Sequence, residues 1–522
     1  MRIELLSADE TPEALGDRVL SPDLIKEYYV QREHRPVWIE KNTLSEPALQ
    51  LMQEVMRSEQ EGLRSRTYHS AAFMSLFNAR GITESTLKPL TPDQLIGTEL
   101  LLTDSFFLLA DHYRGGRIDP VSIDPDWEAT RSEMDYIGLL QTALRDRDPV
   151  AVLQSLLPQQ PGYARLRETY LRHMALNRNG GWPFIDDGPT LKPGMRSPRV
   201  AQLRARLAIT DSIPSPAALP TDSFDAGLQS AVERFQSRHG LTRDGAVGTG
   251  TLKQLNVPCD QRIAQLMASL ERWRWLPEKM GDRHMYVNIA NFELDIIERG
   301  TQVWTTRVIV GKHYRKTPVF SSQISYMVLN PTWTVPPTIL KNDIIPAVRK
   351  NIGYLAEKKM TVYKSTPSGQ QPVDPATVDW SKTSIPYSIV QSPGPHNALG
   401  AIKFMFPNKY NVYIHDTPSK ELFDKDVRAF SSGCIRVEHP VRLAEKLLEA
   451  DNPATLPVLQ AGLKSSDTQT IRLKTAVPVH IIYLTAWVNP SGSVNFREDI
   501  YGRDERLLAA LRTHAPLDGE EI

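Results

Sequence analysis

The sequence predicts a multidomain α+β protein: a helical scaffold, then a small three-helix domain, then a mostly β domain. Three observations predict this order. The chain has 522 residues, more than one hydrophobic core usually accommodates. Apolar residues recur with a helical period over about the first 180 residues, and the period changes to two from Met285 onward.

Composition narrows the class of protein. Lys and Arg total 61, as do Asp and Glu, so the formal net charge is zero and we predict no nucleic-acid partner. The two cysteines, Cys259 and Cys434, are too few for a disulfide scaffold or a cysteine zinc site. No cluster of His, Asp and Glu has metal-ligand spacing, so we predict no metal and no other cofactor.

The sequence shows no segment that would target or anchor the chain in a membrane. Residues 1–4 are not a basic region followed by an apolar stretch, so we expect no signal peptide here. The most apolar run, 100–110, is interrupted by polar residues and is too short to cross a bilayer.

Residues 1–185 are predicted to form the helical scaffold. Its clearest helix begins at Thr91, a good N-cap, with Pro92 in the first turn and Gln94 completing a capping box; Gly115 and Gly116 end it. We find no chemistry in this region. A later helix, within 257–280, is expected to return to the scaffold, so that the domain between them is an insertion.

The inserted domain, 186–256, is predicted to contain three short helices. Its motifs stand in a fixed order, namely Phe235-Gln236, Gly240-Leu241, Asp244-Gly245 and Thr251-Leu252. This order resembles the peptidoglycan-binding domain type 1. Because most of these residues suit cores and turns, the resemblance indicates the fold better than a binding site, and glycan binding and a structural role both stay open.

The domain from 281 to 515 is predicted to be mostly β. One strand is expected over 286–297, a turn at Arg299-Gly300, and a returning strand over 303–310. Further strands and a final helix are expected at 325–329, 402–405, 411–414, 479–487 and 505–512. The irregular stretch 339–385, with a helix at 343–350, is expected to be a lid or binding insertion.

The strongest chemical signal is the segment Ser431 to Arg436. Gly433 permits a tight turn that exposes the Cys434 thiol, and backbone N–H groups of such a turn can stabilise an oxyanion. His415 ends the predicted strand 411–414 and is a suitable general base; a nearby imidazole or cation would lower the thiol pKa. From the residues alone, a buried inert cysteine and a structural histidine are the commoner interpretation.

A family resemblance favours catalysis. His415, fifteen residues and then Ser431 to Arg436 are similar to the signature of the L,D-transpeptidase (YkuD-type) catalytic domain. Neighbouring segments extend the match, namely Gly394-x-x-Asn397-x-Leu399-Gly400, Lys403 to Phe406, Val412 to Thr417, Glu438 and Pro440. The domain order resembles the large YcbB-type enzymes of Gram-negative bacteria. The resemblance implies a β-sandwich catalytic domain with a lid insertion, and a periplasmic location.

The resemblance also implies a mechanism. Cys434, deprotonated by His415, would attack the carbonyl between the diamino acid and D-Ala of a tetrapeptide stem, with N–H groups around Gly433 and Cys434 stabilising the oxyanion. The side-chain amine of a second stem would resolve the thioester into a 3→3 cross-link. Ser432 stands where many members have His, so His415 is the only motif histidine. Carbapenem acylation of Cys434 is implied as well.

Four residues are predicted to bind substrate: Arg436, Tyr413, Trp333 and Asn397. Arg436 would hold a stem carboxylate, with a structural salt bridge as the alternative. Tyr413 shares a strand face with His415 and would line the cleft, whereas Asp416 points to the opposite face. Trp333 would be a substrate wall or part of the core.

Several functions stay open at this stage. The same residues would serve an L,D-carboxypeptidase, with water resolving the thioester, or a transferase that joins stems to a protein amine. A non-catalytic wall-binding scaffold protein is the alternative of another class, against which the intact His415 and Cys434 speak. The implied partners are the tetrapeptide donor, the diamino-acid amine acceptor and, as a further class, other wall synthases.

Overall fold

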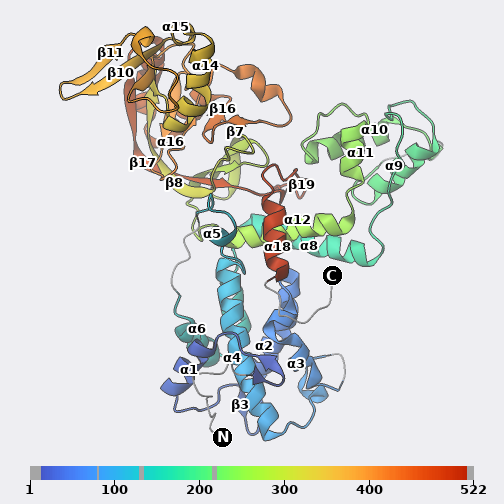
Figure 1. Cartoon of the computed structure of the whole chain (residues 1–522). Helices are drawn as coiled ribbons and strands as arrows, with labels where there is room; N and C mark the ends of the chain where they lie inside the picture. Colours follow the sequence, from blue (N-terminus) through green and yellow to red (C-terminus); the bar gives the residue numbers. More distant parts are fainter. Residues whose placement is uncertain (1–12, 79–80, 129–133, 214–219, 514–522) are drawn as a thin grey trace. The chain divides into compact units, whose positions relative to one another are not determined.

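The computed structural model describes residues 13–78, 81–128, 134–213 and 220–513 (Figure 1). Residues 1–4, for which no signal peptide is expected, lie outside this range. The chain divides into two compact units: Met1–Pro125, Ala129–Glu278 and Thr485–Ile522 form one, and Asp126–Glu128 with Lys279–Leu484 form the other. Within the described ranges, no helix combines the length and apolarity needed to span a bilayer.

The scaffold of the first unit is built around the helix α4, Pro92–Gly115 (Figure 1). The predicted capping box is confirmed: Thr91 accepts from the Gln94 N–H at 3.2 Å, and Gln94 accepts from the Thr91 N–H at 3.0 Å. Gly116 ends the helix with a φ of +75°, a conformation that costs glycine little. Helices of the scaffold pack against α4, among them α1 Pro22–Gln31, α2 Glu46–Arg57, α6 Tyr136–Arg145 and α7 Pro149–Gln154.

The three-helix domain contains α9 Pro198–Ala208, α10 Ala226–Arg238 and α11 Thr249–Leu255. Its apolar stripes meet in one core that includes Leu203, Val232 and Phe235. Gln236 is buried and donates to Asp244, to the Ala246 carbonyl and to Thr251. Of the quoted motif residues, Gln236, Asp244 and Thr251 therefore hold the loop between α10 and α11 together, whereas Phe235 and Leu252 belong to the core.

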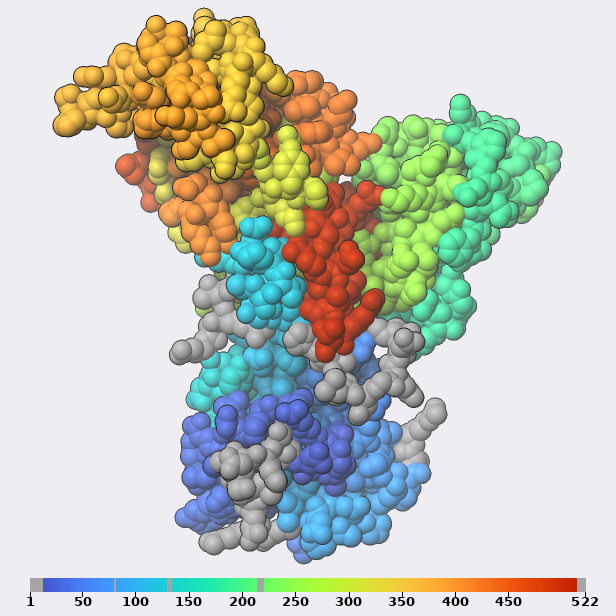
Figure 2. All heavy atoms as spheres, viewed as in Figure 1, coloured from blue at the N-terminus to red at the C-terminus, as the bar shows by residue number. Residues whose placement is uncertain are grey.

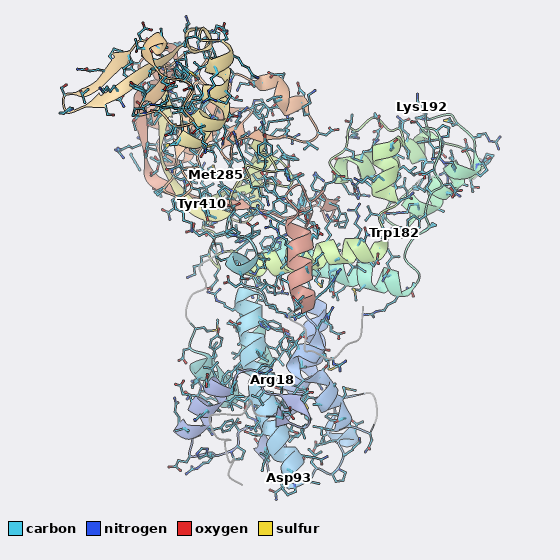
Figure 3. The ribbon with its side chains drawn as sticks, in the orientation of Figure 1. Arg18, Asp93, Trp182, Lys192, Met285 and Tyr410 are labelled. Carbon is cyan, nitrogen blue, oxygen red and sulfur yellow. The ribbon has the colours of Figure 1, made fainter. Side chains whose placement is uncertain are left out.

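Two long helices, α8 Pro161–Arg178 and α12 Cys259–Arg274, pack together in the same unit. Trp182 lies where this pair meets the three-helix domain (Figure 3): its indole N–H donates to the Val257 carbonyl at 3.0 Å, and the Arg206 guanidinium lies 4.1 Å from its ring centroid. Cys259 is buried here, and burial raises the pKa of its thiol to about 11, which disfavours a reactive thiolate.

The second unit contains a nine-stranded sheet in the order β15-β7-β16-β14-β13-β8-β17-β5-β6. Because β6 also pairs with β7, the sheet closes on itself. The strands are β5 Arg283–Asn288, β6 Glu293–Glu298, β7 Thr301–Gly311, β8 Phe320–Leu329, β13 Ile402–Met405, β14 Ile414–His415, β15 Ala429–Ser431, β16 Ile435–Val437 and β17 Gln469–Ile482. Helix α16, Pro440–Asp451, packs against β17.

The prediction of one strand over 286–297 was wrong, because two antiparallel strands, β5 and β6, occupy this range. Phe292 adopts a φ of +58° in the turn between them. The turn contains no Gly or Pro, and apolar residues continue through it, so the sequence carries no punctuation at this point.

The insertion that the sequence predicts as a lid, called the lid below, has a small sheet and core of its own. Its strands run in the order β11-β10-β12-β9, with β9 Trp333–Thr334, β10 Met360–Thr366, β11 Gly369–Val373 and β12 Ser388–Gln391. A helical stretch consists of α13 Pro337–Ile339, the π-helix Leu340–Ile344 and α14 Ile345–Lys350, followed by α15 Tyr354–Glu357. The expectation of irregular structure was wrong for 366–373, which belongs to a hairpin that projects from the lid (Figure 1).

The C-terminal segment belongs to the first unit. It contains a hairpin, β18 Ala486–Val488 and β19 Val494–Phe496, and the helix α18 Arg503–Thr513, which confirms the predicted final helix. Figure 2 shows this segment in red beside the green helices of its unit. The predicted β domain ends at 515, whereas the compact unit that holds its sheet ends at Leu484.

Candidate active site

A row of polar side chains crosses three adjacent strands of the nine-stranded sheet. His415 on β14 lies opposite Lys403 on the antiparallel strand β13, and beside Arg436 on the parallel strand β16. Residues in register on neighbouring strands present their side chains on the same face. The topology therefore gathers one imidazole and two cations on the same face of the sheet, at the strand that the predicted nucleophile turn leads into. In the sequence, 33 positions separate the two ends of this row.

The nucleophile turn, 431–434, connects β15 to β16. Gly433 has a φ of +115°, and a Cβ there would lie 3.4 Å from the Lys316 carbonyl oxygen, so another residue would be strained. The Ser431 hydroxyl accepts from the Gly433 N–H at 3.1 Å and bonds the Cys434 carbonyl, and Thr317 donates to the Gly433 carbonyl at 2.9 Å. The turn is thus held from both sides.

These bonds narrow the predicted oxyanion site. The Gly433 N–H is already committed to Ser431. The Cys434 N–H has no acceptor within the described part of the chain. The backbone donor that remains for a developing oxyanion is therefore that of Cys434.

His415 is held in one tautomer. Its side chain is buried, and its Nδ1 lies at hydrogen-bond distance from the backbone carbonyl of Asp416, so Nδ1 carries the proton and Nε2 is left as an acceptor. Burial first, and the charge of Arg436 second, lower the pKa of His415 to about 3. The imidazole is consequently neutral near pH 7 and able to take a proton.

The carboxylate of Asp416 is engaged elsewhere. It accepts from the backbone N–H groups of Ala401, at 2.8 Å, and Thr417, at 2.7 Å, and it pairs with Lys420. This confirms that its side chain does not orient His415; its main chain does so.

The Cys434 thiol is protonated at rest. Burial raises its pKa, although hydrogen bonding by Tyr413 and the charges of Lys403 and Arg436 oppose this effect. The two cations lower the thiol pKa, as expected of nearby cations, but burial outweighs them and the net pKa is raised. If these two groups react together, a neutral thiol and a neutral imidazole call for proton transfer during attack, and not a preformed ion pair.

Tyr413 links the catalytic row to the lid. Its ring lies edge-on to His415, with 5.5 Å between the centroids, and the Lys403 Nζ lies 3.9 Å from its centroid. Burial raises the pKa of Tyr413, and a side-chain hydrogen bond from Trp333 opposes this. Trp333 also packs against the core of this insertion, which agrees with the second of its two predicted roles, and the role of substrate wall stays a prediction.

Arg436 is half-buried and unpaired. Burial lowers its pKa, whereas Cys434 and Glu421 act in the opposite direction. No carboxylate of the described residues lies within ion-pair distance of its guanidinium, and its Nε is buried without a hydrogen-bond acceptor. Of its two predicted roles, the structural salt bridge is not observed.

Asn397 does not reach the site, contrary to its prediction as a substrate contact. Its side chain is 1% exposed and donates to the carbonyls of Pro331 and Ser392, both at 2.9 Å, while its Oδ1 accepts from the Leu399 N–H at 2.8 Å. Asn397 therefore fixes the loop that leads into β13. An amide in a Gly-rich loop suits both roles in a sequence, and only the hydrogen bonds of the folded chain distinguish them.

Ser432 connects the nucleophile turn to the lid through Arg315. The exposed Ser432 hydroxyl accepts from the Arg315 guanidinium at 2.9 Å, and the same guanidinium pairs with Asp343 of the lid at 2.6 Å. Sequence reasoning missed Arg315 because it stands in a loop with other basic residues and carries no motif.

Removing the lid carboxylate by Asp343→Ala is expected to loosen the helical stretch 337–350. The Asp343 side chain is 45% exposed, so the pair contributes about 1 kcal/mol at most, and amide exchange of this stretch should accelerate by up to about five-fold. Hydrogen–deuterium exchange measures this. Asp379→Ala, which removes an exposed pair with Lys382 inside the lid, is the matched control and should leave 337–350 unchanged. Equal effects of the two variants would contradict a link through Arg315.

No group of three or more His, Cys, Asp or Glu side chains in the described ranges has the geometry to hold a metal ion. The chemistry available at the site is thus that of a thiol, an imidazole, two cations and a backbone N–H group.

Comparison with known families agrees with this geometry. Residues 282–479 match the model of the L,D-transpeptidase catalytic domain, 196–255 match the model described as "Putative peptidoglycan binding domain", and 23–169 match a scaffold domain. Along the chain, a helical scaffold is thus followed by a peptidoglycan-binding domain and then by an L,D-transpeptidase catalytic domain.

Among curated proteins, a Haemophilus influenzae protein described as "Putative L,D-transpeptidase" is 34% identical over 254 residues, which is 48% of this chain and 50% of that protein. The match therefore spans about half the length of this relative. Solved L,D-transpeptidases from Xylanimonas cellulosilytica and Stackebrandtia nassauensis share 14% and 13% identity, with TM-scores of 0.18 and 0.22. Each alignment covers 57% of this chain, and 100% and 96% of those chains respectively.

Proposed function

We propose that this chain is a peptidoglycan L,D-transpeptidase that forms 3→3 cross-links through a thioester on Cys434. The observation that carries the proposal is the arrangement of β14 and β16, which sets a neutral His415 with a free acceptor nitrogen beside the turn that presents the thiol. The match of 282–479 to the catalytic-domain model supports the same reaction class.

In the first half-reaction, the Cys434 Sγ gives its proton to the His415 Nε2 and attacks the carbonyl carbon between the diamino acid and D-Ala. The oxyanion accepts a hydrogen bond from the Cys434 N–H. As the C–N bond breaks, His415 returns the proton to the departing D-Ala amine, and the thioester remains.

In the second half-reaction, the side-chain amine of another stem attacks the thioester carbon. His415 accepts the amine proton and passes it to the Cys434 sulfur as the C–S bond breaks. This restores the resting thiol and the neutral imidazole, which is the state that the pKa directions of the two groups favour.

A domain that binds the cell wall would be useful to an enzyme whose substrate is a polymer. The match of 196–255 to a model described as a putative peptidoglycan-binding domain supports retention on the wall, and we propose the periplasm as the site of action. We also propose stem peptides as donor and acceptor, with other wall synthases as a further partner class.

Incubation with purified disaccharide-tetrapeptide, followed by mass spectrometry, tests the proposal. Cross-linked dimer with released D-Ala, both absent with Cys434→Ala, is the expected result. Tripeptide without dimer would replace the proposal by an L,D-carboxypeptidase, and transfer to an added protein amine would indicate a stem-to-protein transferase. No turnover with tetrapeptide or with whole sacculi would favour a non-catalytic wall-binding protein.

The pH dependence of donor turnover should show the low pKa of His415. Because the imidazole loses its neutral form only as the pH approaches about 3, kcat/KM should stay level from about pH 8 to about pH 5. An ordinary histidine would cause a decline below about pH 6.5. The measurement is D-Ala release across this range, with circular dichroism to verify that the protein stays folded. An acid limb near pH 6.5 would contradict the burial of the base.

A further inference from the structure

We propose that Lys403 and Arg436 together form a carboxylate subsite that binds the C-terminal carboxylate of the donor stem and so selects donors that end one residue beyond the scissile bond. The inference rests on the proposed function and assigns a specificity-determining role to Lys403.

Lys403 lies at the end of the row that contains the general base. It faces His415 across the β13–β14 pair, and Arg436 lies on the other side of His415. Its Nζ is 3.9 Å from the ring centroid of Tyr413, the residue that hydrogen-bonds Cys434.

The Lys403 ammonium has no partner in the described part of the chain, neither a hydrogen-bond acceptor nor a carboxylate at ion-pair distance. Neighbouring lysines differ in this respect. Lys420 pairs with Asp416, and the largely exposed Lys409 pairs with Glu128. Lys403 is thus a half-buried lysine without an anionic partner, and burial lowers the pKa of its ammonium group.

A half-buried ammonium without a counter-ion is unfavourable, and Arg436 adds a second unpaired cation to the same row. An anionic group that enters the site would offset this cost. Two cationic groups on either side of an imidazole suit a carboxylate, because its two oxygens can accept from both.

The donor stem has a carboxylate at the required place. The carboxylate carbon of the terminal D-Ala is three bonds from the scissile carbonyl carbon, which is at most about 4 Å. When Cys434 attacks that carbonyl, this carboxylate must lie beside the sulfur, where Lys403 and Arg436 are found. The oxyanion itself is served by the Cys434 N–H, so the cations are left for the chain end.

The test compares the tetrapeptide donor with its C-terminal amide, and measures kcat/KM from the release of D-Ala or D-alaninamide. The wild type should prefer the free acid by roughly ten-fold or more, as expected for a charge-assisted hydrogen bond. Lys403→Met keeps the length and apolar stem of the side chain and removes its charge. It should lower turnover of the acid by about ten-fold, leave the amide within about two-fold, and so remove the preference.

Two further variants complete the design. Lys409→Met removes an exposed lysine of the adjacent segment and should change neither substrate. Lys403→Arg restores a cation and should restore preference for the acid, which also guards against a folding defect in the Met variant; thermal melts of all variants accompany the kinetics.

Each outcome decides the inference. Equal turnover of acid and amide by the wild type would overturn it while the transpeptidase proposal stands. Equal loss of both substrates in Lys403→Met would overturn it in favour of thiolate stabilisation. Absence of wild-type turnover with either donor would remove the proposed function and the inference with it.

Discussion

Replacing His415 by asparagine is expected to lower the rate of thioester formation by about 10²- to 10⁴-fold, the usual contribution of a positioned general base. Asparagine retains an N–H donor near the place of Nδ1, so the contact with the Asp416 carbonyl can persist. It offers no group at the place of Nε2 that accepts a proton. Burst-phase mass spectrometry of the acyl-enzyme measures the effect.

The resting protonation states make this loss large. Burial raises the pKa of Cys434 and lowers that of His415, so few molecules contain a preformed thiolate. Cys434→Ala is the negative control for acyl-enzyme formation. Titration of the thiol with a neutral disulfide reagent verifies that Cys434 is still accessible in the His415→Asn variant. A variant that acylates within five-fold of the wild type would show that His415 is not the base.

Local chemistry explains which parts of the fold could be predicted. The capping box at Thr91 depends on residues within one turn, and the helices of the three-helix domain depend on apolar spacing within about thirteen residues. The order of the domains along the chain and the sharp turn at Gly433 could also be predicted from the sequence. In each case the residues that specify the feature are neighbours in the sequence.

The catalytic row could be predicted only in part, because strand register brings it together. His415 and Cys434 share a signature, but Lys403 joins them only through the pairing of β13 with β14. Its single trace in the sequence is a charged residue within an apolar strand, Ile402 to Met405. Arg315 and Thr317 act on the nucleophile turn from the β7–β8 loop, more than a hundred residues away in the chain.

Long-range contacts also explain why the predicted end of the β domain, at 515, differs from the end of its compact unit, at Leu484. Buried polar bonds attach the C-terminal segment to the first unit. Asp504 on α18 pairs with Arg272 on α12 and accepts from Thr485 at 2.6 Å, and the Ala486 N–H donates to Ser269 of α12 at 3.1 Å. The bonds to Arg272 and Ser269 join segments more than 200 residues apart in the chain. Hydropathy of the sequence gives no sign of them.

Arg272→Met is accordingly expected to destabilise the first unit by about 3–5 kcal/mol, because it leaves the buried Asp504 carboxylate without its cation. Guanidinium unfolding monitored by tryptophan fluorescence measures the change. The matched control is Arg196→Met, whose pair with Asp222 is exposed at 62% and 38%, and which should cost about 1 kcal/mol or less.

The loss of unfolding free energy in Arg272→Met is also expected to depend on pH in a definite direction. Burial raises the pKa of Asp504, and Arg272 opposes the rise, so removing the arginine raises that pKa further. A carboxyl group with a raised pKa binds its proton more tightly in the folded state, so its protonation stabilises that state as the pH falls. The variant should therefore recover part of its lost stability as the pH is lowered. A deficit that stays below 1 kcal/mol, or that does not shrink on acidification, would show that the ion pair does not hold α18 to α12.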